Sequence, residues 1–462
     1  MIPTNIRLGE MRWWNRALVI AACALGSASF FAVEHWPHPS TPAAREKLAA
    51  NPLPPAVLLP SNEGATAAAI RFFSERVRRD PEDTRSQNAL AQSYLQRVQE
   101  SGNEDDLPLA LAAARASLAA IGAERNIGGL TALTHAELAN HGFAAARAHA
   151  LRLVELNPTK SEPRAILGDA CLELGEYEQA TEAFREMERL GADNIGTQTR
   201  LARLAFLRGS PAQARQHFSS ALILLLDLPS PPREAVAWYR WQLGETAFAA
   251  GDYGRAERHY RDTLTTAPDY FRALGSMGRL CAARGDLPAA IDFYEQAVRM
   301  APSVVFMAAL GDLYRLAGRE REAATRYELV EQLGEHSRRV HGTPFDRAIT
   351  LYWADHDLKL GEAYSLARGE YDAGRHDIYG ADALAWTALK TNRMEEAQAA
   401  IKEALKLGTL DTKLLYHAGM IARQAGDRAT AADYLRRARA LNPGFDPLQS
   451  ERARRILEES SQ

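Results

Sequence analysis

The sequence predicts an all-α protein built as a solenoid, which is a coiled array of helical pairs. From residue 62 onward apolar residues recur with helical spacing, and no stretch alternates with a period of two for long enough to build a sheet. An alanine also recurs at intervals of 34, 34, 42, 34, 33, 40, 34 and 34 residues, and a fixed period of this length marks repeat architectures. These alanines are Ala146, Ala180, Ala214, Ala256, Ala290, Ala323, Ala363, Ala397 and Ala431.

The first 36 residues have the pattern of a membrane-targeting segment. Residues 1–16 hold three arginines and should stay in the cytoplasm, whereas the run that follows is uncharged from 17 to 33. As a helix this run spans about 26 Å against a hydrocarbon core of about 30 Å, and tryptophans flank it on both sides. We expect a transmembrane anchor over 17–36. A signal peptide cleaved after the small residues at 27–29 is the alternative.

The remaining boundaries follow from composition. Residues 37–61 hold seven prolines, which exclude a helix and favour an extended linker. A leading helix is expected within 62–83, the repeats over 84–445, and a charged closing helix over 446–462. A stack of repeats needs such ends because an open terminal pair exposes its apolar face.

One unit, "RALGSMGRLCAARGDLPAAIDFYEQAVRMAP" at 272–302, explains the pattern. Gly278 and Ala290 stand where two helices cross, and small side chains let the backbones approach closely. Gly285 ends the first helix in a conformation that a Cβ would penalise. Tyr294 belongs to the packing face of the second helix. No residue in this unit requires a catalytic role.

The stretches "LGDACLELGEYEQATEAF" (167–184), "LGETAFAAGDYGRAERHY" (243–260) and "LGDLYRLAGREREAATRY" (310–327) resemble the tetratricopeptide repeat (TPR) family. The resemblance implies a right-handed α-solenoid of about ten helical hairpins. In each hairpin a first helix, A, lines the concave side and is followed by a second helix, B. The segment 377–427 is also similar to exported bacterial members of the family, which implies a protein of the bacterial cell envelope.

Two features depart from the regular unit. The longer alanine spacings predict insertions at 223–236 and 331–343. In addition, Leu358 and Asn392 stand where other units have the glycine of the turn between helices A and B. The conformation of these two turns is therefore open.

The sequence contains few motifs that indicate catalysis or the binding of a metal or cofactor. A net charge of -3 gives no field that would attract nucleic acid, and no nucleotide-binding, hydrolase or metalloprotease motif occurs. We expect no cofactor, no metal and no enzymatic activity. The alternative is a metal- or small-ligand-dependent enzyme that uses Asp355, His356 and Asp357, although neighbouring residues on a helix point in different directions.

In the TPR family the concave groove is the usual docking surface for peptides, so the resemblance implies a partner-binding site there. Aromatic and Arg residues dominate binding energy in such grooves. A first expected group is Trp238, Trp241 and Arg279, with Arg203, Phe206 and Phe248. A second is Tyr352, Asp355, His356, Tyr379, Trp386, Lys390 and Arg423, with Lys413. The core between repeats could equally contain four of the first group, namely Trp238, Trp241, Phe206 and Phe248, so we favour the second group.

These observations predict a non-enzymatic scaffold that binds a protein or peptide in its groove. It would be anchored in the inner membrane with the repeats outside the cytoplasm, or released to the periplasm after signal cleavage. A structural spacer or self-assembling array is a further alternative.

Overall fold

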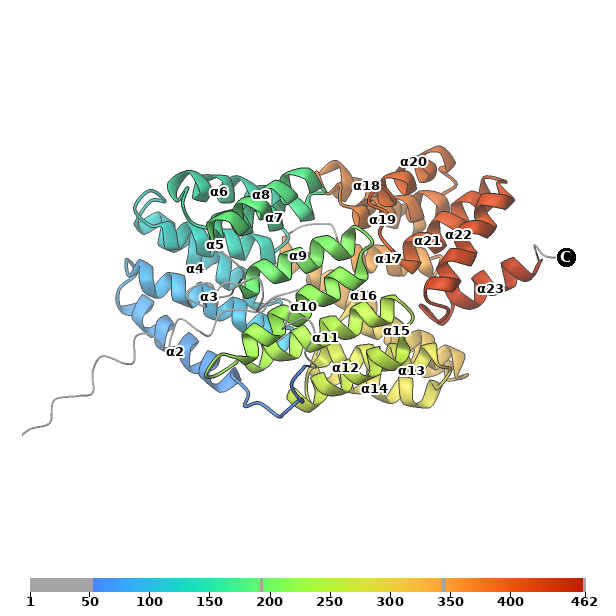
Figure 1. Cartoon of the computed structure of the whole chain (residues 1–462), viewed down its shortest axis with the longest axis horizontal. Coiled ribbons are helices and arrows are strands. Elements are labelled where there is room, and N and C mark those ends of the chain that lie inside the picture. Colours follow the sequence, from blue (N-terminus) through green and yellow to red (C-terminus); the bar gives the residue numbers. More distant parts are fainter. Residues whose placement is uncertain (1–52, 192–193, 343–345, 460–462) are drawn as a thin grey trace, which may run out of the picture.

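The computed structural model describes residues 53–191, 194–342 and 346–459. Over these ranges the chain forms 22 helices and no strand, which confirms the all-α prediction (Figure 1). The expected membrane segment 17–36 lies outside the described residues. Among the helices that are described, none combines the length and the apolar character needed to cross a bilayer.

Ten helical pairs follow the leading helix α2 (Glu63–Arg79), and α23 (Gln449–Glu459) comes after the last pair in the described chain. The A helices are α3 (Thr84–Ser101), α5 (Ile127–Ala139), α7 (Glu162–Glu173), α9 (Ile195–Leu207), α11 (Arg233–Ala249), α13 (Phe271–Ala283), α15 (Val304–Leu316), α17 (Arg347–Asp355), α19 (Ile378–Lys390) and α21 (Thr412–Gln424). The B helices are α4 (Asp106–Ala120), α6 (Phe143–Leu156), α8 (Tyr177–Leu190), α10 (Pro211–Leu226), α12 (Tyr253–Thr266), α14 (Leu287–Met300), α16 (Glu320–His341), α18 (Leu360–Asp372), α20 (Met394–Ala404) and α22 (Arg428–Leu441).

Burial confirms the register of the repeat. All nine marker alanines are at most 3 % exposed. At the helix crossing of the sixth pair, a Cβ added to Gly278 would lie 2.5 Å from the ring of Tyr294, closer than atoms in contact can approach. The small residues that set the 34-residue period are therefore the ones that let each A helix pack on its B helix.

The two irregular turns use left-handed residues other than glycine, and in the eighth pair Lys359 (φ 40°) is left-handed as well. Asn392 adopts the left-handed conformation (φ 58°) that glycine has in most other turns, and Asn tolerates it better than most residues do. In the eighth pair Asp357 (φ 57°), rather than Leu358, is left-handed. The insertion predicted at 331–343 lengthens α16 to 22 residues.

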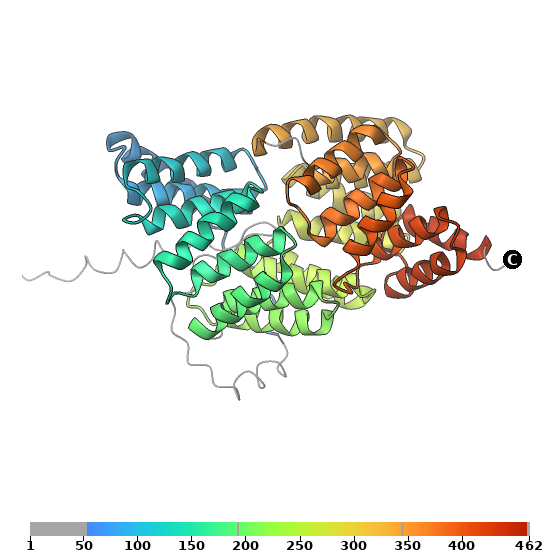
Figure 2. The same cartoon turned by 90° about the horizontal axis from the view of Figure 1, so that it is seen from above.

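The array coils tightly enough that its later part lies against its earlier part. Figure 2 shows the helices following a curved path from blue through green and yellow to orange. Hydrogen bonds join the A–B turns of early pairs to the loops that follow later B helices, 189 to 202 residues further along the chain. We call this set of contacts the seam.

Hydrogen bonds of the seam start from the second, third, fourth and fifth helical pairs in turn. Its hydrogen bonds are Asn140 Nδ2 to the His341 carbonyl, Arg375 Nε to the Glu173 carbonyl, the Ile378 amide to Tyr177 Oη, Thr409 Oγ1 to the Leu207 carbonyl and Asn442 Nδ2 to the Phe248 carbonyl. An added Cβ on Gly251 would lie 2.6 Å from the carbonyl oxygen of Leu441. By contrast, nothing lies within 4 Å of the same position on Gly285 or Gly318, whose turns are outside the seam.

The segment 53–61 extends the seam at the amino-terminal end. It has no helix, in keeping with its prolines, and its backbone bonds to the fifth pair. The Leu59 amide donates to the Thr266 carbonyl at 3.2 Å, and Arg240 Nη2 donates to the Pro54 carbonyl at 3.0 Å. Leu53 and Leu59 pack on the apolar core of α10 to α12. This part of the linker is therefore attached to the repeats rather than a free spacer.

Candidate functional site: the central cavity

The coil surrounds a cavity of 1390 Å³ that is lined by residues from most of the A helices and from the seam. This volume exceeds the roughly 300 to 1,000 Å³ of a pocket for a drug-sized ligand. The lining extends from Ser101 to Asp411, which are 310 residues apart in sequence, so the cavity exists only because the array coils back on itself.

Part of the cavity lining is apolar and aromatic. Phe206 on α9 and Trp241 on α11 are half-buried and line it, and Trp241 is held by a hydrogen bond from Nε1 to Ser276 Oγ at 2.9 Å. Met300 and Val305 line the same cavity and are 50 % and 59 % exposed. Large apolar side chains that stay exposed in a cavity that also holds aromatic rings are typical of a binding surface.

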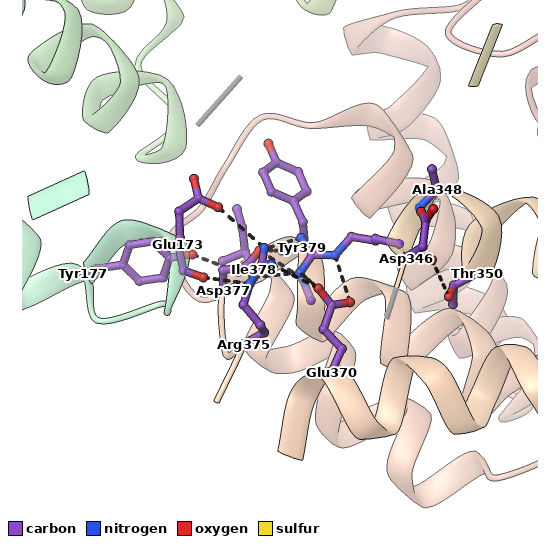
Figure 3. Close-up of polar contacts among 12 residues, drawn as sticks. Glu173, Tyr177, Asp346, Ala348, Thr350, Glu370, Arg375, Asp377, Ile378 and Tyr379 are labelled. Atoms are coloured by element: carbon purple, nitrogen blue, oxygen red, sulfur yellow. Dashed lines mark hydrogen bonds and ion pairs between the residues drawn. The ribbon is translucent and has the colours of Figure 1, made fainter. Parts of the chain in front are cut away.

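Ion pairs form another part of the lining, and one of them crosses the seam (Figure 3). Arg347 Nη2 lies 2.9 Å from Oε1 of Glu370 and 2.9 Å from Oδ2 of Asp377. Arg375 reaches Oε2 of Glu173 at 3.5 Å, which joins α7 to the loop before α19. These five residues form a charged wall of the cavity, and Arg375 links this wall to the seam.

Asp377 is the centre of this wall. Burial alone would raise the pKa of its carboxyl group, but the guanidinium groups of Arg347 and Arg375 outweigh burial and hold the pKa below its ordinary value. Its Oδ1 atom also accepts the backbone N–H groups of Tyr379 and Gly380, which caps the start of α19.

This pKa shift predicts an acid-sensitive contribution to stability. We expect Asp377→Asn to lower the free energy of unfolding by about 1–3 kcal/mol at neutral pH, because Asn keeps the cap but not the charge. A lowered carboxyl pKa stabilises the fold above the unfolded-state value near 3.9 and loses that effect as pH falls through the folded-state value. In urea denaturation, the difference between wild type and variant should shrink below about pH 4. A difference independent of pH would contradict the charge argument.

The cavity lining contains four of the ten expected site residues, namely Trp238, Trp241, Arg279 and Tyr379. The other six, Tyr352, Asp355, His356, Trp386, Lys390 and Arg423, lie outside it. Arg423 pairs with Glu459 of α23. The second group, which the sequence favoured, is therefore mostly absent from the inner wall, and the physical reason is that these side chains pack between pairs.

Trp386 and Asp355 belong to a packed polar network. The Trp386 ring is 2 % exposed and stacks on the His417 ring with centroids 4.1 Å apart. Its Nε1 atom donates to Asp355 Oδ1 at 2.8 Å, and Asp355 also accepts from Lys413 Nζ at 3.0 Å and Gln449 Nε2 at 2.9 Å. These bonds tie α17, α19, α21 and α23 together.

His356 and Asp357, which follow Asp355, bind partners on different helices. His356 Nε2 lies 2.8 Å from Asp312 Oδ1, and the Tyr352 ring packs against the His356 ring. Asp357 instead points to Lys390, whose Nζ atom donates to Oδ1 at 2.6 Å. The three residues Asp355, His356 and Asp357 thus do not converge. No group of His, Cys, Asp and Glu in the described ranges is arranged to hold a metal.

Sequence reasoning missed the charged cavity wall. Glu173, Arg347, Glu370, Arg375 and Asp377 lie at helix ends, where charges are ordinary solvated residues in most repeats. The only signal that could have found them is the seam itself, and a contact between residues about 200 positions apart leaves no local pattern in one sequence.

Helical pairs that stack and coil around a concave inner surface define an α-solenoid protein. Comparison with known families is more specific. Residues 131–195, 242–305 and 383–444 match one description of the tetratricopeptide repeat, and residues 193–269 match another. The chain is thus a tetratricopeptide-repeat protein, as the sequence motifs indicated.

The relatives are distant. The chain is 23% identical over 288 residues to the protein CTR9 homolog of Arabidopsis thaliana, covering 60% of this chain and 25% of that protein. Among solved structures it is similar to PilW, described as a widely conserved type IV pilus biogenesis factor, with 18% identity, a TM-score of 0.37, and 44% of this chain and 91% of PilW covered. MamA gives 18% identity, a TM-score of 0.29, and coverage of 36% and 94%.

Proposed function

We propose that this chain is a non-enzymatic scaffold whose central cavity binds a short peptide segment of a partner protein. The observation that carries the proposal is an inner wall that pairs ordered aromatic rings with exposed Met300 and Val305. Such a surface lowers its free energy when a partner covers it. The cavity volume suits a peptide of a few residues and is far too small for a folded domain.

The setting we propose is the bacterial cell envelope, with residues 17–36 as an inner-membrane anchor and the repeats outside the cytoplasm. Support comes from the arginines before the apolar run and from the tryptophans that flank it. Removal of the segment as a signal peptide would leave the same repeats free in the periplasm.

Site-directed photo-crosslinking in bacterial cells tests both parts. We would place p-benzoylphenylalanine in the full chain at Phe206 or Tyr379, which line the cavity, and at Leu151 as a control. Leu151 is 44 % exposed on α6 and lies outside the cavity lining. We expect a discrete adduct from both cavity positions, recovered with the membranes, and none from Leu151.

Adducts from Leu151 alone would contradict cavity binding, and recovery of the protein in the cytosol would contradict the envelope setting. The enzyme alternative gains no support from the arrangement of Asp355, His356 and Asp357. No particular observation favours the spacer or array alternative.

A further inference from the structure

The cavity has an unequal balance of charge. Five arginines line it, and each forms an ion pair with a carboxylate that also lines it. The pairs are Arg200 with Asp169, Arg203 with Glu173, Arg279 with Glu245, and Arg347 and Arg375 with Glu370 and Asp377. The five positive charges are thus matched by five negative charges from the same wall.

Three further carboxylates remain in the lining, on Glu104, Asp346 and Asp411. Within the described residues none of the three forms an ion pair with Lys or Arg. Glu104 lies 3.4 Å from His341 Nε2. The spare charge of the cavity is therefore negative, although the protein as a whole is close to neutral.

Asp346 and Asp411 hold fixed positions because each caps a helix. Asp346 Oδ1 accepts the amides of Ala348 and Ile349, and Asp411 Oδ1 accepts those of Lys413 and Leu414. Burial raises the pKa of both carboxyl groups. A raised carboxyl pKa means that the ionised form is poorly compensated, so a cation placed nearby would stabilise it.

The exposed apolar side chains of the same cavity supply a second requirement. Met300 and Val305 gain by contact with a bulky apolar side chain, whereas an acidic group would meet carboxylates with no free arginine to receive it. The two requirements together specify a partner chemistry.

We infer that the cavity selects a segment that carries Lys or Arg side chains next to bulky apolar side chains, and that it rejects acidic segments. This inference rests on the proposed function and specifies the partner for it. The ammonium or guanidinium groups would lie near Asp346 and Asp411, and the apolar groups against Trp241, Met300 and Val305.

Three synthetic peptides of about ten residues would test the selection by fluorescence anisotropy with the full chain. They share the same Leu, Trp and Ser residues and differ only by Lys, Gln or Glu at two positions. We expect the Lys peptide to bind about tenfold more tightly than the Glu peptide, with the Gln peptide between them, because one charge-assisted contact is worth about that factor.

The variant Asp346→Asn/Asp411→Asn should remove most of the advantage of the Lys peptide and leave the Kd of the Gln peptide unchanged. Asn is as good a cap as Asp, so both helices keep their starts, and unchanged Gln binding shows that the cavity is folded. The matched control is Asp427→Asn, which alters an exposed cap of α22 outside the cavity. It should change none of the three affinities.

The outcomes separate the two proposals. Equal binding of all three peptides, tighter binding of the Glu peptide, or a Lys advantage that persists in the double variant would overturn the charge selection and leave cavity binding in place. If none of the three binds, the charge selection and the cavity as a peptide site both fail.

Discussion

Replacing Trp386 with alanine is expected to lower the free energy of unfolding by about 3–5 kcal/mol, the usual cost of removing a buried large aromatic side chain. The indole is 2 % exposed and fills the space between α19 and α21, where it stacks on His417. Its removal leaves a cavity lined by atoms that lose contacts on one side. It also removes one of the donors to the carboxylate of Asp355.

Urea denaturation followed by circular dichroism measures this loss. Trp241→Ala is the matched control, because Trp241 is the same residue type on another A helix but is half-buried at the cavity. We expect it to cost less than half as much stability while weakening binding of the Gln peptide. Equal losses for the two variants would mean that Trp386 is not the packing residue that its burial indicates.

The contrast between these two tryptophans shows where the sequence was informative. The 34-residue period identifies the small residues at each crossing, because a crossing tolerates only small side chains. It therefore predicted the burial of residues such as Ala290 and Gly278 in advance. The period also predicts where A helices end, because Gly285 and its equivalent glycines adopt a left-handed conformation that ends the helix.

The face on which an aromatic residue lies is harder to predict. Trp238, Trp241 and Trp386 all stand on A helices, and the repeat pattern gives each a comparable chance of facing inward. What decides between them is the neighbouring pair. His417 and Asp355 come from two other helices and hold Trp386 in the packed network. Such a network depends on residues of three units at once, which the pattern of one unit does not contain.

The charged wall of the cavity is beyond sequence reasoning for a related reason. Arg375 and Glu173 meet only because the coil makes a full turn in about 200 residues, and that pitch depends on small angles between successive pairs. The period of the repeat gives the number of pairs but not the pitch. The seam and the cavity beside it therefore depend on how the whole array coils.

Gly251→Ala should be more damaging than the same substitution at a turn outside the seam, and it tests the seam directly. Alanine at φ 71° costs about 1–2 kcal/mol wherever it occurs. At Gly251 the added methyl group would also lie 2.6 Å from the Leu441 carbonyl oxygen. Removing this overlap either costs about 1–3 kcal/mol of further stability or separates the two segments that meet at the seam. Gly318→Ala, at φ 74° with nothing within 4 Å, carries the conformational cost alone.

Two measurements separate these contributions. In urea denaturation Gly251→Ala should lose more stability than Gly318→Ala by the overlap energy. Amide hydrogen exchange should also become faster at Gly444, whose N–H donates to Tyr253 Oη across the seam at 2.9 Å, in Gly251→Ala but not in Gly318→Ala. Because several seam residues line the cavity, Gly251→Ala should weaken peptide binding as well. Identical stability and exchange in the two variants would show that the turns of the coil are not held together at this position.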